Sequence, residues 1–396
     1  MNRGQTGDSP TAARAAALRA RLDPRNEIRL VRAPGRVNLI GEYTDFNMGF
    51  VLPAAIDREV WIALELTELP EVELTSVELN ETRSFTFDGL SPKAGQATTW
   101  IDYIAATAWA MDQAGLPLRG FRGVLDSTIP MGSGLSSSAA LEMAASFALA
   151  DTSSPRPTAA EMAAIAQRGE NVYVGLNCGI MDQFASAAGR AGHALLIDCR
   201  VNEALATPIP ESLSLVVCDT GAPRRLGTAY NTRRAECELG VRLIAEREPG
   251  VKSLRDVDFE MLERNRDRLP ENVARRCEHI VHEDDRVMAT VSALRDGDLE
   301  ALGRLFAASH ASLRDLLEVS SPELDLMVDI ATGVPGVIAS RMTGGGFGGC
   351  TVSLVVRGAE EALREKVLRD YVKLTGLDAK VYAVSAVDGA GEIEAR

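Results

Sequence analysis

The stretch that decides the fold runs from Ile129 to Ala140 and reads IPMGSGLSSSAA. Its glycines and serines lie between an apolar segment and an alanine-rich stretch, Leu141 to Ala150, whose composition favours a helix. We therefore predict a loop that leads into the N-terminus of a helix. Such a junction leaves backbone N–H groups unpaired and carries the positive end of the helix dipole, and both features suit a phosphate group.

The same residues allow a simpler interpretation, a serine-rich helix N-cap after a flexible turn. The spacing excludes two common nucleotide motifs, because no lysine follows the glycines and the G-x-G-x-x-G fingerprint does not occur here. The phosphate interpretation still has a physical basis. Glycines let the backbone approach an anion closely, and serine hydroxyls suit phosphate oxygens or a magnesium ion.

A second polar stretch follows a predicted strand, Ile28 to Ala33. It reads GRVNLIGEYTDFNMG from Gly35 to Gly49. The carboxylates of Glu42 and Asp45 can accept hydrogen bonds from several hydroxyls at once, which is the chemistry of a sugar site. On residue types alone, a solvated hairpin loop explains the stretch equally well.

Two further turns stand out along the chain. The turn from Val174 to Gln183 reads VGLNCGIMDQ and places Asp182 among apolar residues, where an unpaired carboxylate is costly. The alternative for Asp182 is an acid at a helix N-terminus, favoured by the helix dipole. The segment from Thr343 to Cys350 reads TGGGFGGC, and so many glycines predict a loop between two strands.

Together these stretches resemble a known family. Pro-x-Gly-x-Gly-Leu-Ser-Ser-Ser-Ala is similar to the phosphate loop of the GHMP small-molecule kinases, and TGGGFGGC is similar to their third signature. The stretch from Gly35 to Gly49 resembles the sugar signature of one branch, the galactokinases, and the turn around Asp182 resembles the segment that carries their catalytic aspartate. The resemblance covers residues 28 to 389, nearly the whole chain.

Composition agrees with a small-molecule enzyme. The 396 residues suffice for two domains, and the net charge of −14 argues against nucleic-acid or membrane-surface partners. No apolar run reaches the roughly 18 residues that a membrane span needs. The six cysteines are scattered without a C-x-x-C pair, which favours reduced thiols in a cytoplasmic protein over a zinc site or a disulfide framework.

The resemblance implies an α+β GHMP fold with the active site between two domains. We expect an N-terminal domain, residues 1–210, like the second domain of ribosomal protein S5. A C-terminal domain, residues 211–396, should be ferredoxin-like. The pattern along the chain shifts near residue 210 from mixed strands and helices to mostly helices. We expect a monomer or a weak homo-oligomer.

The implied reaction transfers a phosphoryl group from ATP to O1 of α-D-galactose and gives galactose 1-phosphate, the entry of galactose into the Leloir pathway. Asp182 would accept the proton of the O1 hydroxyl. Arg36 beside it would stabilise the transferring phosphoryl group and keep the carboxylate ionised. Ser138 and Glu170 would bind Mg²⁺.

The remaining candidates fall into two sets. Predicted ATP-binding residues are Gly132, Ser133, Gly134, Leu135, Ser136, Ser137 and Ser138, with Trp100 and Tyr103 beside the adenine. Predicted sugar-binding residues are Glu42, Tyr43, Thr44, Asp45, Gly179 and Tyr230. A packed core or a half-buried helix face explains Trp100, Tyr103 and Tyr230 as well on residue type alone.

Two alternatives remain open at this stage. A kinase for arabinose, galacturonate or N-acetylgalactosamine is one, because Tyr43 and Phe46 replace the usual His and Tyr and Met48 stands at a position that is often small. In galactokinases that His helps to hold the C6 oxygen, so we expect somewhat relaxed discrimination at C6. A galactose sensor without activity is the other alternative, but such relatives lose the Ser-Ala pair, which is present here as Ser138-Ala139.

Overall fold

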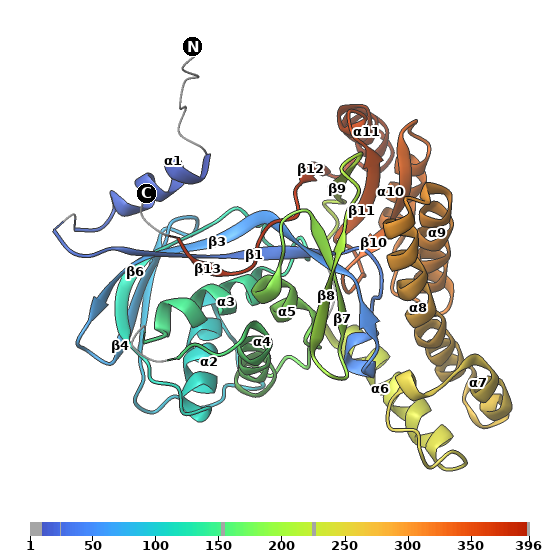
Figure 1. The fold of residues 1–396 in the computed structure, drawn as a ribbon, viewed down its shortest axis with the longest axis horizontal. Coiled ribbons are helices and arrows are strands. Elements are labelled where there is room, and N and C mark those ends of the chain that lie inside the picture. The colour runs from blue at the N-terminus through green and yellow to red at the C-terminus, as the bar shows by residue number, and fades with distance from the viewer. Residues whose placement is uncertain (1–9, 24, 152–154, 224–226, 394–396) are drawn as a thin grey trace.

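The fold is described by a computed structural model that covers residues 10–23, 25–151, 155–223 and 227–393. Two large sheets, each covered by helices, lie end to end along the long axis of the molecule (Figure 1). Among the described residues, no helix is both long enough and apolar enough to cross a membrane.

The first large sheet has the strand order β13-β1-β3-β6-β4-β5 and is antiparallel except where β4 lies beside β6. Its strands are β1 (Arg29–Asn38), β3 (Pro53–Thr67), β4 (Glu71–Ser76), β5 (Glu81–Thr86), β6 (Gly120–Ser127) and β13 (Gly391–Glu392). One face is covered by α2 (Trp100–Gln113), α3 (Ser137–Leu149), α4 (Ala159–Arg168) and α5 (Met181–Ala188), whereas α1 (Pro10–Arg19) lies on the other face (Figure 1).

Strand β3 explains why both faces are covered. Its side chains alternate, as in any strand: Ile62 and Leu64 belong to the main core below the sheet, while Trp61 and Ala63 pack in the cluster that includes Leu18 of α1. Because β3 is apolar on both sides, it needs a partner layer on each.

The second large sheet is antiparallel and has the order β10-β11-β9-β12. Its strands are β9 (Leu213–Asp219), β10 (Val337–Thr343), β11 (Cys350–Val356) and β12 (Lys380–Val384). The helices in this half of the chain are α6 (Gly227–Ala245), α7 (Phe259–Asn265), α8 (Glu271–Asp296), α9 (Leu299–Asp315), α10 (Pro322–Thr332), α11 (Glu360–Lys366) and α12 (Val372–Thr375). A small sheet, β2 (Phe50–Val51), β7 (His193–Asp198) and β8 (Glu203–Pro208), lies between the two large sheets.

The mixed α+β architecture predicted from the sequence is therefore confirmed, with two local differences. The first strand does not end at Ala33: β1 continues to Asn38, because a register shift at Pro34 and Gly35 accommodates the two residues that usually interrupt a strand. The second difference is β13, which pairs with β1 in the first sheet at a position where no strand was expected. The division near residue 210 stays a prediction, and it falls between β8 and β9.

Candidate active site

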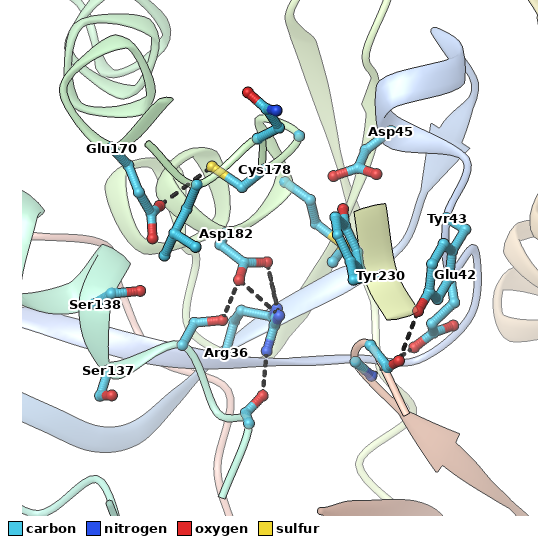
Figure 2. A pocket seen from close by; sticks show the side chains of 18 of the residues that line it. Arg36, Glu42, Tyr43, Asp45, Ser137, Ser138, Glu170, Cys178, Asp182 and Tyr230 are labelled. Carbon is cyan, nitrogen blue, oxygen red and sulfur yellow. Dashed lines mark hydrogen bonds and ion pairs between the residues drawn. The ribbon is translucent and has the colours of Figure 1, made fainter. Parts of the chain in front are cut away.

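A cavity of about 330 Å³ lies where β1, the loop before α3, the turn before α5 and α6 converge (Figure 2). It brings together most of the predicted residues, although they come from distant parts of the chain. Those that line it are Arg36, Glu42, Tyr43, Asp45, Gly132, Gly134, Ser136, Ser137, Ser138, Glu170, Gly179, Asp182 and Tyr230.

The centre of the cavity is a paired aspartate and arginine. Arg36 donates from Nε to Oδ1 of Asp182 at 2.8 Å and from Nη2 to Oδ2 at 2.7 Å, the two-bond geometry typical of arginine and carboxylate (Figure 2). The third guanidinium nitrogen donates to the Gly134 carbonyl oxygen at 2.8 Å. The arginine is buried, whereas the Asp182 side chain is 29% exposed toward the cavity. Asp182 is therefore fixed in orientation and still accessible to a ligand.

The phosphate loop adopts the backbone that its glycines suggest. Gly132 and Gly134 have φ values of 72° and 81°, in the left-handed region that glycine enters without strain. Ser136 also lies there, at φ 61°, and its hydroxyl donates to Asp182 Oδ2 at 2.5 Å. Helix α3 begins at the next residue, Ser137, so its free N–H groups lie at the cavity wall. The predicted loop and helix start are confirmed.

A second cavity of about 220 Å³ adjoins the first. Ser137 and Ser138 line both cavities, and Trp100 and Tyr103 from α2 line the second. The indole of Trp100 is held by a hydrogen bond from Nε1 to Glu81 at 3.1 Å. The N-terminus of α3 thus lies between the cavity that holds Arg36 and Asp182 and the cavity lined by Trp100 and Tyr103. This arrangement suits the phosphates and the base of a nucleotide.

Glu170 lies in a π-helical turn, Gly169–Val174, that follows α4. Such turns are rare and occur frequently at functional sites. Burial raises the pKa of Glu170 to about 7. Hydrogen bonds from the Cys178 thiol and from the Ser138 hydroxyl oppose this shift but do not cancel it. Gln183 donates to Glu170 at 2.6 Å and to the buried Glu142 at 3.0 Å. A buried carboxyl beside a serine hydroxyl is a set of oxygen ligands that suits a hard divalent cation.

Asp45 and Gly179 fit against each other on the far side of Asp182. A Cβ atom at Gly179 would lie 1.8 Å from Asp45 Oδ2, so no side chain other than hydrogen fits at this position. Burial raises the pKa of Asp45 to about 6, and the negative charge of Asp182 contributes to the same shift. The rings of Tyr43 and Tyr230 are 5.2 Å apart and close this end of the cavity, with Phe46 packed against both.

Glu42 is held from behind by residues that the motif analysis missed. It is 1% exposed, forms an ion pair with the fully buried Arg341 of β10, and accepts a hydrogen bond from the Gly344 N–H at 3.1 Å. The neighbouring carboxylate Glu283 of α8 accepts the Gly41 N–H at 3.0 Å. A single arginine beside a glycine-rich loop and an acid in a long helix carry no sequence pattern of their own, so no signal in the sequence pointed to either.

Three predicted residues lie behind the cavity wall. The Thr44 hydroxyl donates to the carbonyl oxygens of Gly41 and Phe50, and the Ser133 hydroxyl donates to that of Pro130. Leu135 is 1% exposed and belongs to the main core. The side chains of these residues support the loops, and their predicted ligand contacts stay predictions.

Comparison with known proteins agrees with this geometry. Family models match residues 102–190 (GHMP kinases N terminal domain), residues 21–66 (galactokinase galactose-binding signature) and residues 290–373 (GHMP kinases C terminal). A galactokinase of Roseiflexus sp. strain RS-1 is 43% identical over 92% of this chain and 93% of its own. A galactokinase of Chloroflexus aurantiacus is 43% identical over 92% of both chains.

Solved structures point the same way. A crystal structure of Lactococcus lactis galactokinase complexed with galactose is 31% identical and superposes with a TM-score of 0.90 over 97% of this chain and all of that chain. A mevalonate kinase, 20% identical with a TM-score of 0.62 over 91% of this chain and 99% of that one, shares the fold alone. Sequence identity over nearly the full length, the sugar signature and the fold lead to one conclusion: this chain belongs to the galactokinase family of the GHMP kinases.

Proposed function

We propose that this protein transfers the γ-phosphoryl group of ATP to O1 of α-D-galactose. The observation that carries the proposal is the position of Asp182. This carboxylate is held by Arg36 and Ser136, and it lies between the phosphate loop and the polar groups at the Asp45 end of the cavity. A hydroxyl bound beside Asp182 would therefore face a phosphate bound at the N-terminus of α3.

The proposed step forms a bond between the sugar O1 and the γ-phosphorus and breaks the bond from that phosphorus to the β,γ-bridging oxygen. ADP leaves with the bond electrons. The O1 proton passes to Asp182, which orients the hydroxyl and accepts its proton, and then to solvent. Arg36 supports this step by holding both carboxylate oxygens and by placing a positive charge next to the reacting phosphoryl group.

Glu170 and Ser138 are the residues that would hold Mg²⁺. The described residues contain no group of three or more His, Cys, Asp or Glu side chains that could enclose a metal. The Glu170 carboxyl and the Ser138 hydroxyl would supply two oxygen ligands to such an ion. When bound, it supplies charge neutralisation between the β- and γ-phosphates.

The sugar and the base would occupy opposite ends of the joined cavities. Trp100 and Tyr103 support a purine in the second cavity, because a flat aromatic wall suits a flat ring. Glu42, Asp45 and Tyr230 support sugar hydroxyls at the other end of the first. One chain supplies all of these groups, and we expect a monomer or a weak homo-oligomer. The cysteines, scattered without a C-x-x-C pair, favour a cytoplasmic location.

A kinase for a related sugar is the second candidate, and Tyr43 is the observation that favours it. The Tyr43 hydroxyl donates to the Gly345 carbonyl oxygen at 2.6 Å, so its proton is already committed and it offers a sugar only an acceptor. A panel of galactose, arabinose, galacturonate and N-acetylgalactosamine with ATP, followed by coupled detection of ADP, tests both. Galactose should give the highest kcat/KM, and a higher value for another sugar would transfer the proposal to that sugar.

A further inference from the structure

We propose that Arg341, which lies outside every sugar motif, positions Glu42 and thereby sets how strongly the enzyme requires the sugar hydroxyl that Glu42 binds. The inference rests on the proposed sugar-kinase function. It assigns a specificity role to a positioning residue of the C-terminal half that does not line the cavity itself.

The geometry fixes both oxygens of Glu42. Arg341 comes from β10 and is fully buried, and its Nη2 forms the ion pair with Glu42 Oε2. Its Nη1 donates to the carbonyl oxygen of Leu39 at 3.0 Å, which ties the same guanidinium to the backbone of the sugar loop. The other oxygen, Oε1, accepts the Gly344 N–H. The orientation of the carboxylate therefore depends on the strand and on the glycine-rich loop that follows it.

A second layer holds Arg341 in place. Its Nη2 lies 3.8 Å from Oε1 of Glu283, a carboxylate that is 0% exposed. Glu283 in turn accepts hydrogen bonds from Ser309 Oγ at 2.5 Å and from Arg286 Nε at 2.6 Å. Two carboxylates and two guanidinium groups thus alternate in a cluster, and their formal charges cancel; Glu42, Glu283 and Arg341 are buried, and Arg286 is half-buried. Such a cluster is costly to build and strongly dependent on each member.

Without Arg341, Glu42 would be a buried carboxylate next to another buried carboxylate. Burial already raises the pKa of Glu42, the negative charge of Glu283 adds to that effect, and Arg341 opposes it. Loss of the guanidinium would favour the protonated acid and free the side chain to rotate. A neutral, loosely held carboxyl would no longer be a fixed acceptor for a sugar hydroxyl, so the penalty for a sugar that lacks this hydroxyl would fall.

The test measures KM and kcat for galactose and for its 2-, 3-, 4- and 6-deoxy analogues. In the wild-type protein, the analogue that lacks the Glu42-bound hydroxyl should have a kcat/KM lower by about 5- to 150-fold, the cost of leaving a buried acceptor unpaired. In Arg341→Met, KM for galactose should rise while kcat changes little, and the ratio between galactose and that analogue should fall toward one.

Arg276→Met is the matched control. Arg276 is also a buried arginine, 2% exposed, and it pairs with Glu236 and Glu318 away from the cavity. This variant should lower the melting temperature but leave the ratio unchanged. If Arg341→Met does not fold, Arg341→Lys carries the test, because it keeps the charge but loses the planar fork and should lower the ratio partially.

A double-substitution cycle tests whether Arg341 acts through Glu42. Glu42→Gln and the Glu42→Gln/Arg341→Met pair should show the same ratio, because the group that Arg341 positions is already changed. The inference would be overturned if the folded Arg341 variants kept the wild-type ratio of kcat/KM between galactose and the deoxy analogue. It would also be overturned if Arg341→Met changed this ratio in a protein that already carries Glu42→Gln. A wild-type protein that does not phosphorylate galactose would instead overturn the proposed function.

Discussion

The two ends of the cavity are built in different ways. At the phosphate end, Arg36, Ser136 and Asp182 come from the first half of the chain and contact one another directly. At the sugar end, Glu42 and Tyr43 are held by Arg341 and Gly345, about three hundred residues later in the sequence. The phosphate end is thus assembled within the first half of the chain, from segments up to 146 residues apart, whereas the sugar loop takes its shape from contacts that reach into the second half.

The two ends also differ in exposure. The Asp182 side chain is 29% exposed, while those of Glu42 and Arg341 are 1% and 0% exposed. A reacting group must be open to ligands that come and go. A group that discriminates between hydroxyls gains from a dry, fixed setting, where an unmatched acceptor is costly. Substitutions at the first end should therefore act on kcat, and those at the second end on KM.

The largest effect should come from Asp182→Asn. The amide keeps the size of the side chain but cannot accept the proton, and a positioned proton acceptor typically contributes about 10²- to 10⁴-fold to the rate. We expect kcat to fall by at least that much while the affinity for an ATP analogue, measured by calorimetry, stays the same. Near-normal turnover of the folded variant would show that Asp182 is not the proton acceptor at the phosphate end.

Gly179→Ala should act on the sugar end through space alone. The new methyl group would lie 1.8 Å from Asp45 Oδ2 and force the carboxylate to move. A lost hydrogen bond between a sugar hydroxyl and a charged carboxylate costs about 1.5–3 kcal/mol, so kcat/KM for galactose should fall by roughly 10- to 150-fold, mostly through KM. Gly250→Ala is the matched control, because a Cβ there meets nothing within 4 Å and the variant should match the wild type. A fall in kcat with an unchanged KM would instead place Gly179 at the phosphate end of the cavity.

Glu170→Gln should change the metal requirement. Loss of a residue that only supports a metal ligand commonly costs about 10- to 100-fold in affinity, so loss of a ligand should raise the Mg²⁺ concentration for half-maximal rate at least about 10-fold. The KM for galactose should stay the same, since Glu170 lies on the side of Ser138 and away from Tyr43 and Tyr230 (Figure 2). A weaker sugar affinity together with an unchanged Mg²⁺ titration would remove Glu170 from the phosphate end.

The same contrast explains what the sequence could predict. The loop before α3, the turn before Asp182 and the α+β order follow from glycine placement and apolar patterning, which are local properties, and the resemblance then supplied roles for most of the cavity residues. The ion pair between Arg341 and Glu42 could not be predicted, because it joins a strand of the second sheet to the loop that follows β1 of the first sheet, about three hundred residues away in the sequence. The extension of β1 through Pro34 and Gly35 was missed because tertiary pairing overrode a local propensity against strands.

Acid should weaken the binding of the sugar at the Asp45 end of the cavity. With a pKa of about 6, Asp45 is ionised above that pH and neutral below it, and only the ionised form is purely an acceptor for hydroxyls. Galactose affinity should therefore fall as the pH drops through 6, by up to about tenfold for each further unit. The measurement is galactose affinity by calorimetry as a function of pH. In Asp45→Asn the fall in affinity at acidic pH should disappear. In Asp182→Asn it should shift to lower pH, because the charge of Asp182 contributes to the shift. A fall that persists in Asp45→Asn would assign the titration to another group.

The smallest effect, and the sharpest test of the sugar end, should come from Tyr43→Phe. The ring packing against Tyr230 and Phe46 is retained, and only the hydroxyl that donates to Gly345 is lost. In the wild type this oxygen can accept a hydrogen bond from the C6 hydroxyl of galactose, an interaction of about 0.5–1.5 kcal/mol. The preference for galactose over 6-deoxygalactose should thus fall by roughly 2- to 12-fold, with kcat unchanged.

Tyr43→His gives the opposite comparison. An imidazole can offer a donor or an acceptor to the C6 hydroxyl, so discrimination at C6 should become tighter than in the wild type. Equal preference for the two sugars in the wild type, or an unchanged preference in Tyr43→Phe, would mean that the phenol serves only the glycine-rich loop. In that case Tyr43 would link the two halves of the chain, and discrimination at C6 would rest on Glu42 and the arginine behind it.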